Sequence, residues 1–433
     1  MLAALVALAV YALPGLLAPA ANWPLWDVRV YWWGGRQAAA GGGALYVPGA
    51  PFNFTYPPFA ALLFAASAAA SGGALKITLT TGSLVALPLL CGQSLAAAGV
   101  RLRAEAIVLV SALALLTWPV AYTLHLGEVN LILAALIGAD LLWPRGAAEG
   151  SSPAEPAEPR AGSGPAGRRD GARWQGIGIG LAAGIKLTPL IFVAYLFLTR
   201  RVRAAVTAAV TFAATITAGF LWLPARSSAF WLGGVFYDQT RIGDPANPSD
   251  QSLGGAIARL AGTGDPPRTW WLVAALAVGL VGLAIAVWAH RRGHRLGGFV
   301  CCAVTGLLAS PVSWTHHWVW DIPLLVWLTA TAWRWRPVAG AGRGGRAGRG
   351  GRAGRWGRAV CALAAVAGAV IFSDYTPLPW PGHPPDAGRM LASDLYVLFG
   401  LAMLAATGVA LAWERSGERG RRYGRERARD RTL

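Results

Sequence analysis

Two polar clusters interrupt long apolar stretches, and their residue types suit binding of a phosphate or a sugar. Lys186 lies inside the apolar stretch 176–199, where a charged residue costs about 3 kcal/mol on membrane-insertion scales. Pro189 follows it and removes a backbone donor, which breaks a helix. A lysine at such a break is suited to face an anion such as a lipid phosphate, and the alternative is that it snorkels to the membrane interface.

The second cluster is Ser310-Pro311-Val312-Ser313-Trp314-Thr315-His316-His317-Trp318. The imidazoles of His316 and His317 are suited to hydrogen bonds with phosphate or sugar, although the pattern also fits helix caps within an interfacial aromatic belt. Adjacent side chains diverge, and no third ligand lies nearby in sequence. The sequence therefore predicts no metal site here.

Asp27 is the only acidic residue in residues 1–104, and it follows an apolar segment closely. A carboxylate at a membrane interface is costly unless it has a partner or a task. One interpretation makes Asp27 a general base that takes a proton from a hydroxyl nucleophile. The other makes it a helix cap or an ion-pair partner of Arg29. No Asp-x-Asp pair accompanies it, so no two-carboxylate metal site is predicted.

Further polar residues lie in two other segments. His125-Leu126-Gly127-Glu128-Val129-Asn130 stands at the start of an apolar stretch, where these side chains either bind sugar hydroxyls or cap a helix. The segment 225–269 contains Asp238, Arg241, and Asp250-Gln251-Ser252. It is too long for a simple connection, so it is expected to be functional or disordered.

These residues must be positioned by membrane helices. The chain is 55% hydrophobic and only 13% charged, whereas soluble domains carry about 25% charged residues. The net charge of +18 does not indicate nucleic-acid binding, because the basic residues form short runs between apolar segments. The four cysteines lie in or beside apolar runs without zinc spacing, so they are interpreted as small buried side chains.

Stretches long enough to cross about 30 Å of hydrocarbon recur along the chain. The stretches 57–71 and 176–199 are irregular, and we expect both to be re-entrant or broken elements around an internal cavity. The first apolar segment, Met1 to Ala21, lacks a basic leader and is interpreted as a span. The predicted spans are 2–20, 76–98, 105–122, 128–143, 203–223, 270–290, 297–311, 317–335, 358–372 and 392–413.

Basic loops predict the orientation in the membrane. The arginine-rich segments should face the cytoplasm, which places the loops 21–56, 225–269 and 373–391 outside. The predicted organisation is a catalytic membrane domain, a basic low-complexity loop, a C-terminal helix pair and a basic cytoplasmic tail. These occupy residues 1–335, 336–357, 358–413 and 414–433, and the first contains a disordered cytoplasmic loop at 145–174.

Taken in chain order, the motifs resemble glycosyltransferase family 87, the polyprenol-phosphate-mannose-dependent mannosyltransferases of the GT-C membrane fold. The resemblance covers about residues 20–335, and its most specific part is the Lys-Leu-Thr-Pro motif together with Ser-Pro-x-Ser-Trp-x-His-His. Glu128 and Asp250 depart from the family, which often has Gln and Asn there. The matching residues are Asp27, Tyr31, Gly41, Tyr46, Tyr56-Pro57-Pro58, 127–130, 185–189, 251–253, and 310–317.

The resemblance implies an all-α polytopic membrane protein of GT-C type with about 10–12 membrane helices, some short or re-entrant, and outer juxtamembrane loops. It implies an inverting mannosyl transfer from a polyprenyl-phosphate donor to a glycolipid acceptor at the outer face of the cell membrane. Asp27 would be the general base, and no cofactor would be required. The residues expected to bind the donor phosphate or sugar are Lys186, His316, His317, Arg29, Tyr46, Tyr56, Glu128, Asn130, Gln251, Ser252 and Trp314.

Two other classes of function compete with the enzyme. A transporter or lipid-carrier flippase would explain a broken helix around a buried lysine, although the two halves of the chain show no internal repeat. A receptor or assembly subunit has only the basic segments in its favour. Membrane lipids are the expected surroundings in every case. The acceptor candidates under the resemblance are phosphatidylinositol mannosides, lipomannan-type polymers and other envelope glycolipids.

Overall fold

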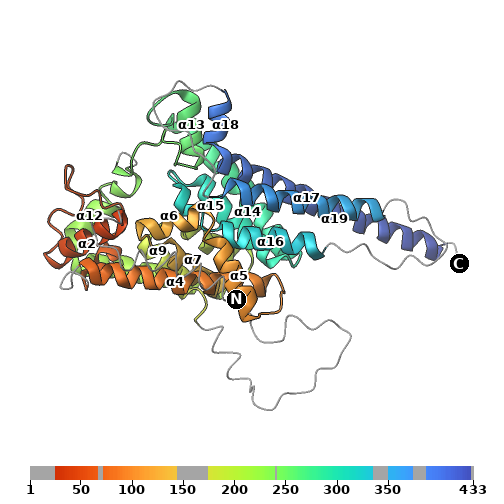
Figure 1. Ribbon diagram of the computed structural model, residues 1–433, viewed down its shortest axis with the longest axis horizontal. Helices are drawn as coiled ribbons and strands as arrows, with labels where there is room; N and C mark the ends of the chain where they lie inside the picture. Colours follow the sequence, from red (N-terminus) through yellow and green to blue (C-terminus); the bar gives the residue numbers. More distant parts are fainter. Residues whose placement is uncertain are drawn as a thin grey trace, which may run out of the picture.

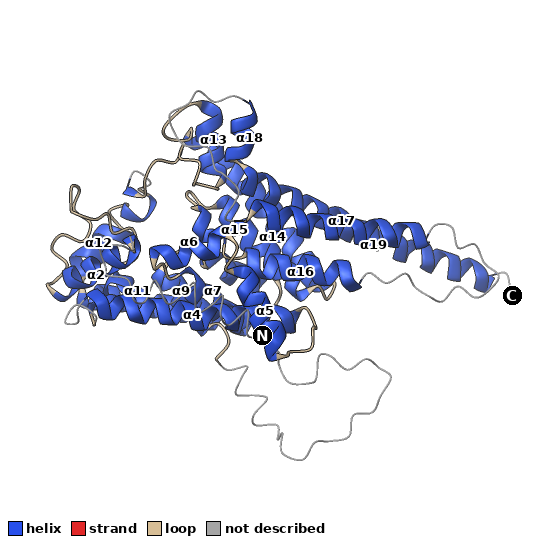
Figure 2. Cartoon of the chain, in the orientation of Figure 1, coloured by secondary structure: helices blue, strands red, loops and turns tan. Residues whose placement is uncertain are grey.

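The chain folds into helices, and a computed structural model describes residues 25–66, 72–143, 174–238, 241–334, 350–373 and 387–430. Among these residues no β-strand forms, and only two isolated bridges occur (Figure 2). The prediction of an all-α polytopic membrane protein is confirmed. The predicted span 2–20 and all but the last residue of the predicted loop 145–174 lie outside the described residues.

The first half of the described chain builds part of the wall of a cavity. Here α2 packs on α3 and α4, and α7 packs on both α4 and α9. The helices are α2 (Trp26–Ala39), α3 (Pro58–Ala65), α4 (Gly72–Ala97), α5 (Ala104–Ala114), α6 (Trp118–Leu126), α7 (Asn130–Leu141), α9 (Ile177–Ile185), α10 (Leu190–Leu198), α11 (Val202–Trp222) and α12 (Pro224–Trp231).

The second half contains the longest apolar helices. In Figure 1, α17 and α19 run side by side away from the rest, and α13 and α18 lie together at the top. The elements are η1 (Val235–Tyr237), α13 (Leu253–Ala261), α14 (Arg268–Arg291), α15 (Arg295–Ala309), η3 (Thr315–Trp318), α16 (Asp321–Arg334), α17 (Gly350–Ile371), α18 (Ala387–Ser393) and α19 (Leu395–Asp430).

Four described helices are long and apolar enough to cross a membrane: α4, α11, α14 and residues Leu395–Arg415 of α19. A fifth candidate is the pair α6 and α7, which is bent by 119° at its break. Three shorter apolar helices of 10–17 residues accompany them. Several predicted spans are therefore shorter or bent in the structure, and α19 continues as a helix through most of the predicted tail 414–433.

The two irregular stretches contain only short helices among the described residues. The stretch 57–71 contains the eight-residue α3, which at 1.5 Å per residue is far too short to cross the hydrocarbon core. The stretch 176–199 divides into α9 and α10, and Lys186 ends the first with extended backbone angles (φ −144°, ψ 132°). The predicted break at Lys186 to Pro189 is confirmed, because α10 begins only after the proline.

The corner between α6 and α7 depends on Gly127. Its φ of +69° is a left-handed conformation that side chains other than glycine rarely adopt. A Cβ at this position would lie 2.3 Å from Cγ2 of Val28 on α2. The glycine thus allows the corner to approach α2 closely. Glu128, the next residue in the sequence, is held near the same helix.

Candidate active site

A cavity of about 1360 Å³ lies between the loop that joins α2 to α3, the α6–α7 corner, the α9–α10 break and η3. We call it the polar cavity. Five of the sequence-predicted site residues contribute to its wall together with Asp27, although they come from distant parts of the chain. These are Tyr56, Lys186, Trp314, His316 and His317.

Asp27 lies in the first turn of α2, where the helix dipole favours a negative charge. Its carboxylate lines the polar cavity and forms no hydrogen bond or ion pair within the described part of the chain. Burial, together with the neighbouring Glu128, raises the pKa of Asp27 to about 8, while Lys186 acts in the opposite direction. An unpaired carboxyl group with a pKa near neutrality is suited to accept a proton from a hydroxyl group.

Lys186 is held by two side chains of the α6–α7 corner. Its Nζ lies 2.8 Å from Glu128 Oε1 and 3.0 Å from Asn130 Oδ1. The Glu128 side chain is only 1% exposed and that of Lys186 is 14% exposed, so the ion pair is shielded while the ammonium still reaches the cavity. A shielded cation at a cavity wall is suited to stabilise an anion that enters.

Two tyrosines complete the surroundings of Glu128. The hydroxyls of Tyr31 and Tyr56 lie 3.0 Å apart, and Tyr56 donates to Glu128 Oε1 at 3.3 Å. Tyr31 also reaches Glu128 Oε1, at 3.5 Å. Tyr46 lies outside the cavity wall, and its hydroxyl donates to the Tyr56 carbonyl at 2.8 Å. The network holds the Glu128 carboxylate in a fixed position beside Lys186.

The two histidines lie in η3, outside the candidate spans. The carbonyl of His316 accepts hydrogen bonds from Asn130 Nδ2 at 2.8 Å and Thr123 Oγ1 at 2.9 Å, which ties η3 to the α6–α7 corner. Burial lowers the pKa of both imidazoles well below its usual value, and the charge of Lys186 lowers it further. Both Nδ1 atoms are buried, and neither has a hydrogen-bond partner in the part of the chain that the structure describes.

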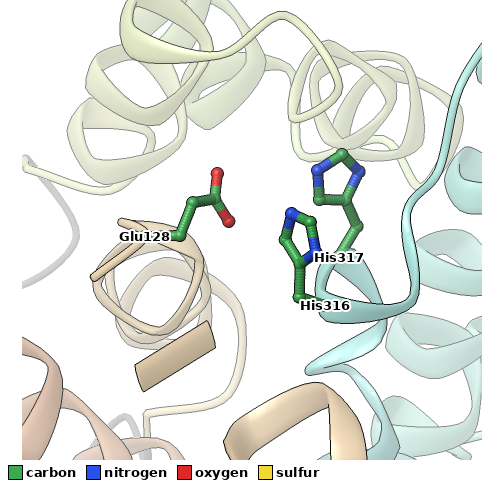
Figure 3. A group of neighbouring side chains, drawn as sticks. All are labelled: Glu128, His316 and His317. Carbon is green, nitrogen blue, oxygen red and sulfur yellow. The ribbon is translucent and has the colours of Figure 1, made fainter. Parts of the chain in front are cut away.

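Glu128, His316 and His317 form a possible cation site that the sequence did not predict. One ligand atom from each lies within 4.8 Å of the others, and Figure 3 shows the carboxylate across from the paired imidazoles. The rings are 4.7 Å apart and nearly perpendicular, so they do not point away from each other as adjacent side chains often do. The third ligand is distant in sequence. Lys186 pairs with Oε1 of the same carboxylate, while Oε2 is buried without a hydrogen-bond partner among the described residues, so a metal ion on Oε2 would meet the positive charge of the neighbouring ammonium group.

The remaining predicted site residues lie away from the polar cavity. Arg29 is exposed on α2, while Glu128 and Asn130 stand behind Lys186 rather than in the wall of this cavity. Gln251 and Ser252 are fully buried at the start of α13. Asn130 lines a small neighbouring apolar pocket that also contains Lys186 and His317, together with residues of α7, α10 and α15.

The segment Asp250-Gln251-Ser252 joins three parts of the structure. Asp250 Oδ1 accepts from the backbone N–H of Ser313 at 2.8 Å, and Gln251 N–H donates to the Ser313 carbonyl at 2.7 Å. The Gln251 side chain bonds to the carbonyls of Pro248 and Ser393 and accepts from the Tyr396 N–H. These contacts position the segment that precedes His316 and His317.

Three residues that line the cavity or contact its lining side chains were not among the predicted site residues. Tyr31 lies four residues after Asp27 on α2, a spacing that places both on one helix face. Tyr122 stacks on His125 and contacts the His316 ring edge to face, with ring centres 5.5 Å apart. Arg241 lines the cavity from the outer loop. Only Tyr31 could have been found from its spacing to Asp27. The positions of Tyr122 and Arg241 depend on contacts between distant segments.

The fold and the cavity together define a polytopic helical membrane protein with a polar cavity lined by Asp27, Lys186 and two histidines. Sequence comparison names the family. Residues 54–311 match the profile of glycosyltransferase family 87. The chain belongs to this family and is a membrane glycosyltransferase, so the family supports the enzyme interpretation over the transporter alternative.

Curated relatives agree with the family assignment. A polyprenol-phosphate-mannose-dependent alpha-(1-2)-phosphatidylinositol mannoside mannosyltransferase of Mycobacterium tuberculosis is 30% identical over 84% of this chain and 78% of its own length. The mannosyltransferase of the same name in Mycolicibacterium smegmatis is 32% identical over 68% of this chain and 67% of its own length. A phosphatidylinositol pentamannoside mannosyltransferase of Mycobacterium tuberculosis is 31% identical over 67% of this chain and 62% of its own length. No solved structure gives a significant match.

Proposed function

We propose that this protein transfers mannose from a polyprenyl-phosphate donor to a phosphatidylinositol mannoside at the outer face of the cell membrane, with inversion at the anomeric carbon. The observation that carries the proposal is that Asp27, Lys186 and His317 line one cavity. The names of the relatives support the donor and the acceptor class. The positive-inside pattern of the basic segments supports the outer face.

The reaction needs a base and a stabilised leaving group on opposite sides of the sugar. Asp27 accepts the proton of an acceptor hydroxyl, and that oxygen bonds to the anomeric carbon. The bond from the anomeric carbon to the phosphate oxygen breaks, and its electrons leave with polyprenyl phosphate. Lys186 and the imidazoles stabilise the charge on that phosphate as it develops. A β-linked donor then gives an α-linked product, and the relatives are named as alpha-mannosyltransferases.

The surroundings of Lys186 suit a lipid donor. The small pocket beside it is lined mostly by apolar side chains, among them Leu133, Ile191 and Phe192. An isoprenoid chain gains by leaving water for such a surface. A donor phosphate near Lys186 would therefore place the start of its hydrocarbon chain next to apolar helices. No nucleotide is needed, because the phosphate itself is the leaving group.

The direct test uses membranes that contain the protein, radiolabelled polyprenyl-phosphate mannose and a phosphatidylinositol mannoside. The wild type should produce a longer, α-mannosidase-sensitive glycolipid, and Asp27→Asn should lower the rate by about a hundredfold or more. Asp244→Asn is the matched control, because Asp244 is an exposed carboxylate of the outer loop. Absence of transfer by the wild type would refute the function, whereas full activity of Asp27→Asn would remove only the role of Asp27.

The outer-face assignment has its own test. Asp244→Cys places a thiol on this exposed loop. Cys91, Cys301 and Cys302 are buried, and the half-buried Cys361 lies in the apolar part of α17, where a membrane-impermeant reagent should not reach it. In intact cells, a membrane-impermeant thiol reagent should label this variant and leave the wild type nearly unlabelled. Labelling that requires permeabilised cells would place the loop on the cytoplasmic side.

A further inference from the structure

Arg241 is a cation of the cavity wall that the proposed reaction does not yet use. It lies in the loop between η1 and α13 and lines the polar cavity. Its Nη1 donates to the Tyr46 carbonyl at 3.1 Å, which fixes one edge of the guanidinium. Its Nε and Nη2 are buried without an acceptor among the described residues. A buried donor without an acceptor costs free energy, and at a cavity wall a ligand can supply the acceptor.

The charge of Arg241 also lacks a counterpart. Lys186 is paired with Glu128, and Arg259 is paired with Asp394. Within the described residues, Arg241 has no carboxylate in a hydrogen bond or ion pair. A guanidinium at a cavity wall with two free donors on its fork matches the geometry of a phosphate group.

The loop that carries Arg241 is fixed against the opposite side of the site. Gly243 adopts a φ of +128° and approaches the Trp314 ring so closely that a Cβ would lie 3.1 Å from it. The Tyr46 carbonyl anchors Arg241 at the other end, and the hydroxyl of the same tyrosine bonds to the Tyr56 carbonyl. Arg241 is thus held between the first outer loop and Trp314 rather than at a free loop tip.

We propose that Arg241 forms a second anion site in the polar cavity and binds the phosphodiester of the acceptor lipid. The inference rests on the proposed function, which brings two phosphate-bearing lipids into one cavity. Two anions that must be bound at the same time repel each other and require separate cations. Lys186 serves the donor phosphate, and Arg241 then determines that the acceptor is an anionic glycolipid rather than a neutral mannoside.

The test compares kinetic constants for two acceptors, a phosphatidylinositol mannoside and a neutral alkyl α-mannoside, with polyprenyl-phosphate mannose as donor. Arg241→Gln keeps a donor for the Tyr46 carbonyl but removes the charge, and Arg241→Lys keeps the charge. Arg268→Gln is the matched control, because Arg268 also lines the cavity but is exposed at the start of α14. Arg241→Gln should raise KM for the anionic acceptor by about ten- to a hundredfold.

The same variant should leave KM for the donor and the rate with the neutral mannoside within about twofold, and Arg241→Lys should recover most of the loss. If the wild type does not use the neutral mannoside, the inference is tested by whether Arg241→Gln raises KM for the anionic acceptor without raising KM for the donor. Equal losses with both acceptors, a raised donor KM, or an equal effect of Arg268→Gln would overturn the inference while leaving the proposed function intact. Failure of the wild type to transfer mannose would overturn both.

Discussion

The ammonium of Lys186 lies 2.8 Å from Glu128 Oε1, so the lysine at the helix break meets a carboxylate before any substrate enters. The pair joins the α6–α7 corner to the α9–α10 break, and Asn130 and two tyrosines surround it. A donor phosphate therefore approaches a lysine whose charge is already shared. Glu128 holds the ammonium in place, and its negative charge also acts on Asp27.

The ion pair should be visible in protein stability. Lys186→Gln leaves Glu128 buried beside neutral groups, and loss of one partner of a buried pair costs about 3 kcal/mol or more. The double variant with Glu128→Gln removes both charges, so it should be more stable than Lys186→Gln alone. Thermal unfolding in detergent micelles measures both. Additive losses in the two single variants and the double variant would show that the charges are not coupled.

The pH dependence of the transfer should follow Asp27. The base must be deprotonated to act, and its pKa is raised to about 8 by burial and by Glu128. The quotient kcat/KM should therefore rise with pH and level off above about pH 8. Glu128→Gln removes a neighbouring negative charge and should shift this rise to lower pH, while Lys186→Gln should shift it to higher pH. Shifts in the same direction for both variants would contradict the assignment of the titration to Asp27.

The helix break was readable from the sequence because its cause is local. Pro189 removes a backbone donor within its own turn, and the structure ends α9 at Ile185 and begins α10 at Leu190. The helical membrane class was equally readable from the apolar stretches. The lengths of individual helices were harder to predict. The predicted span 105–122 contains a break after α5, and most of the predicted tail 414–433 is helical.

The contacts of the site were not readable in the same way. Glu128, Lys186 and His316 are separated by more than fifty residues from one another in the sequence, and nothing local specifies that Asn130 should bond to the His316 carbonyl. Gln251 shows the converse. Its polar side chain in a long predicted loop suggested a ligand contact, whereas the structure places it in hydrogen bonds to backbone carbonyls that connect this loop to the end of α18.

The possible cation site gives a prediction about metals. Because Lys186 already neutralises Glu128 through Oε1, transfer by the wild type should change by less than about twofold after treatment with EDTA. Added Zn²⁺ should inhibit, because a second cation on Glu128, His316 and His317 would weaken the ion pair that holds Lys186. The inhibition should weaken in His317→Ala relative to the activity of that variant without zinc. Loss of activity with EDTA and its recovery with a divalent ion would instead make the cluster a required metal centre.

Removal of Gln251 should destabilise the protein. Its side chain bonds to two carbonyls and one backbone N–H, so Gln251→Ala removes three buried hydrogen bonds and should cost about 2–4 kcal/mol. Gln37→Ala is the matched control, because the Gln37 side chain accepts a single hydrogen bond, from the Ala44 N–H at 3.3 Å, and should cost about 1 kcal/mol or less.

Thermal unfolding of the two glutamine variants in the same detergent makes the comparison. Since Gln251 lies outside the polar cavity, the activity lost by Gln251→Ala should follow the fraction of unfolded protein, and lower temperature should restore it. A variant that stays as stable as the wild type but loses transfer would show that Gln251 acts on the substrate. A raised KM for the donor at low temperature would point to the same conclusion, because unfolding alone lowers the amount of active enzyme without changing its affinity.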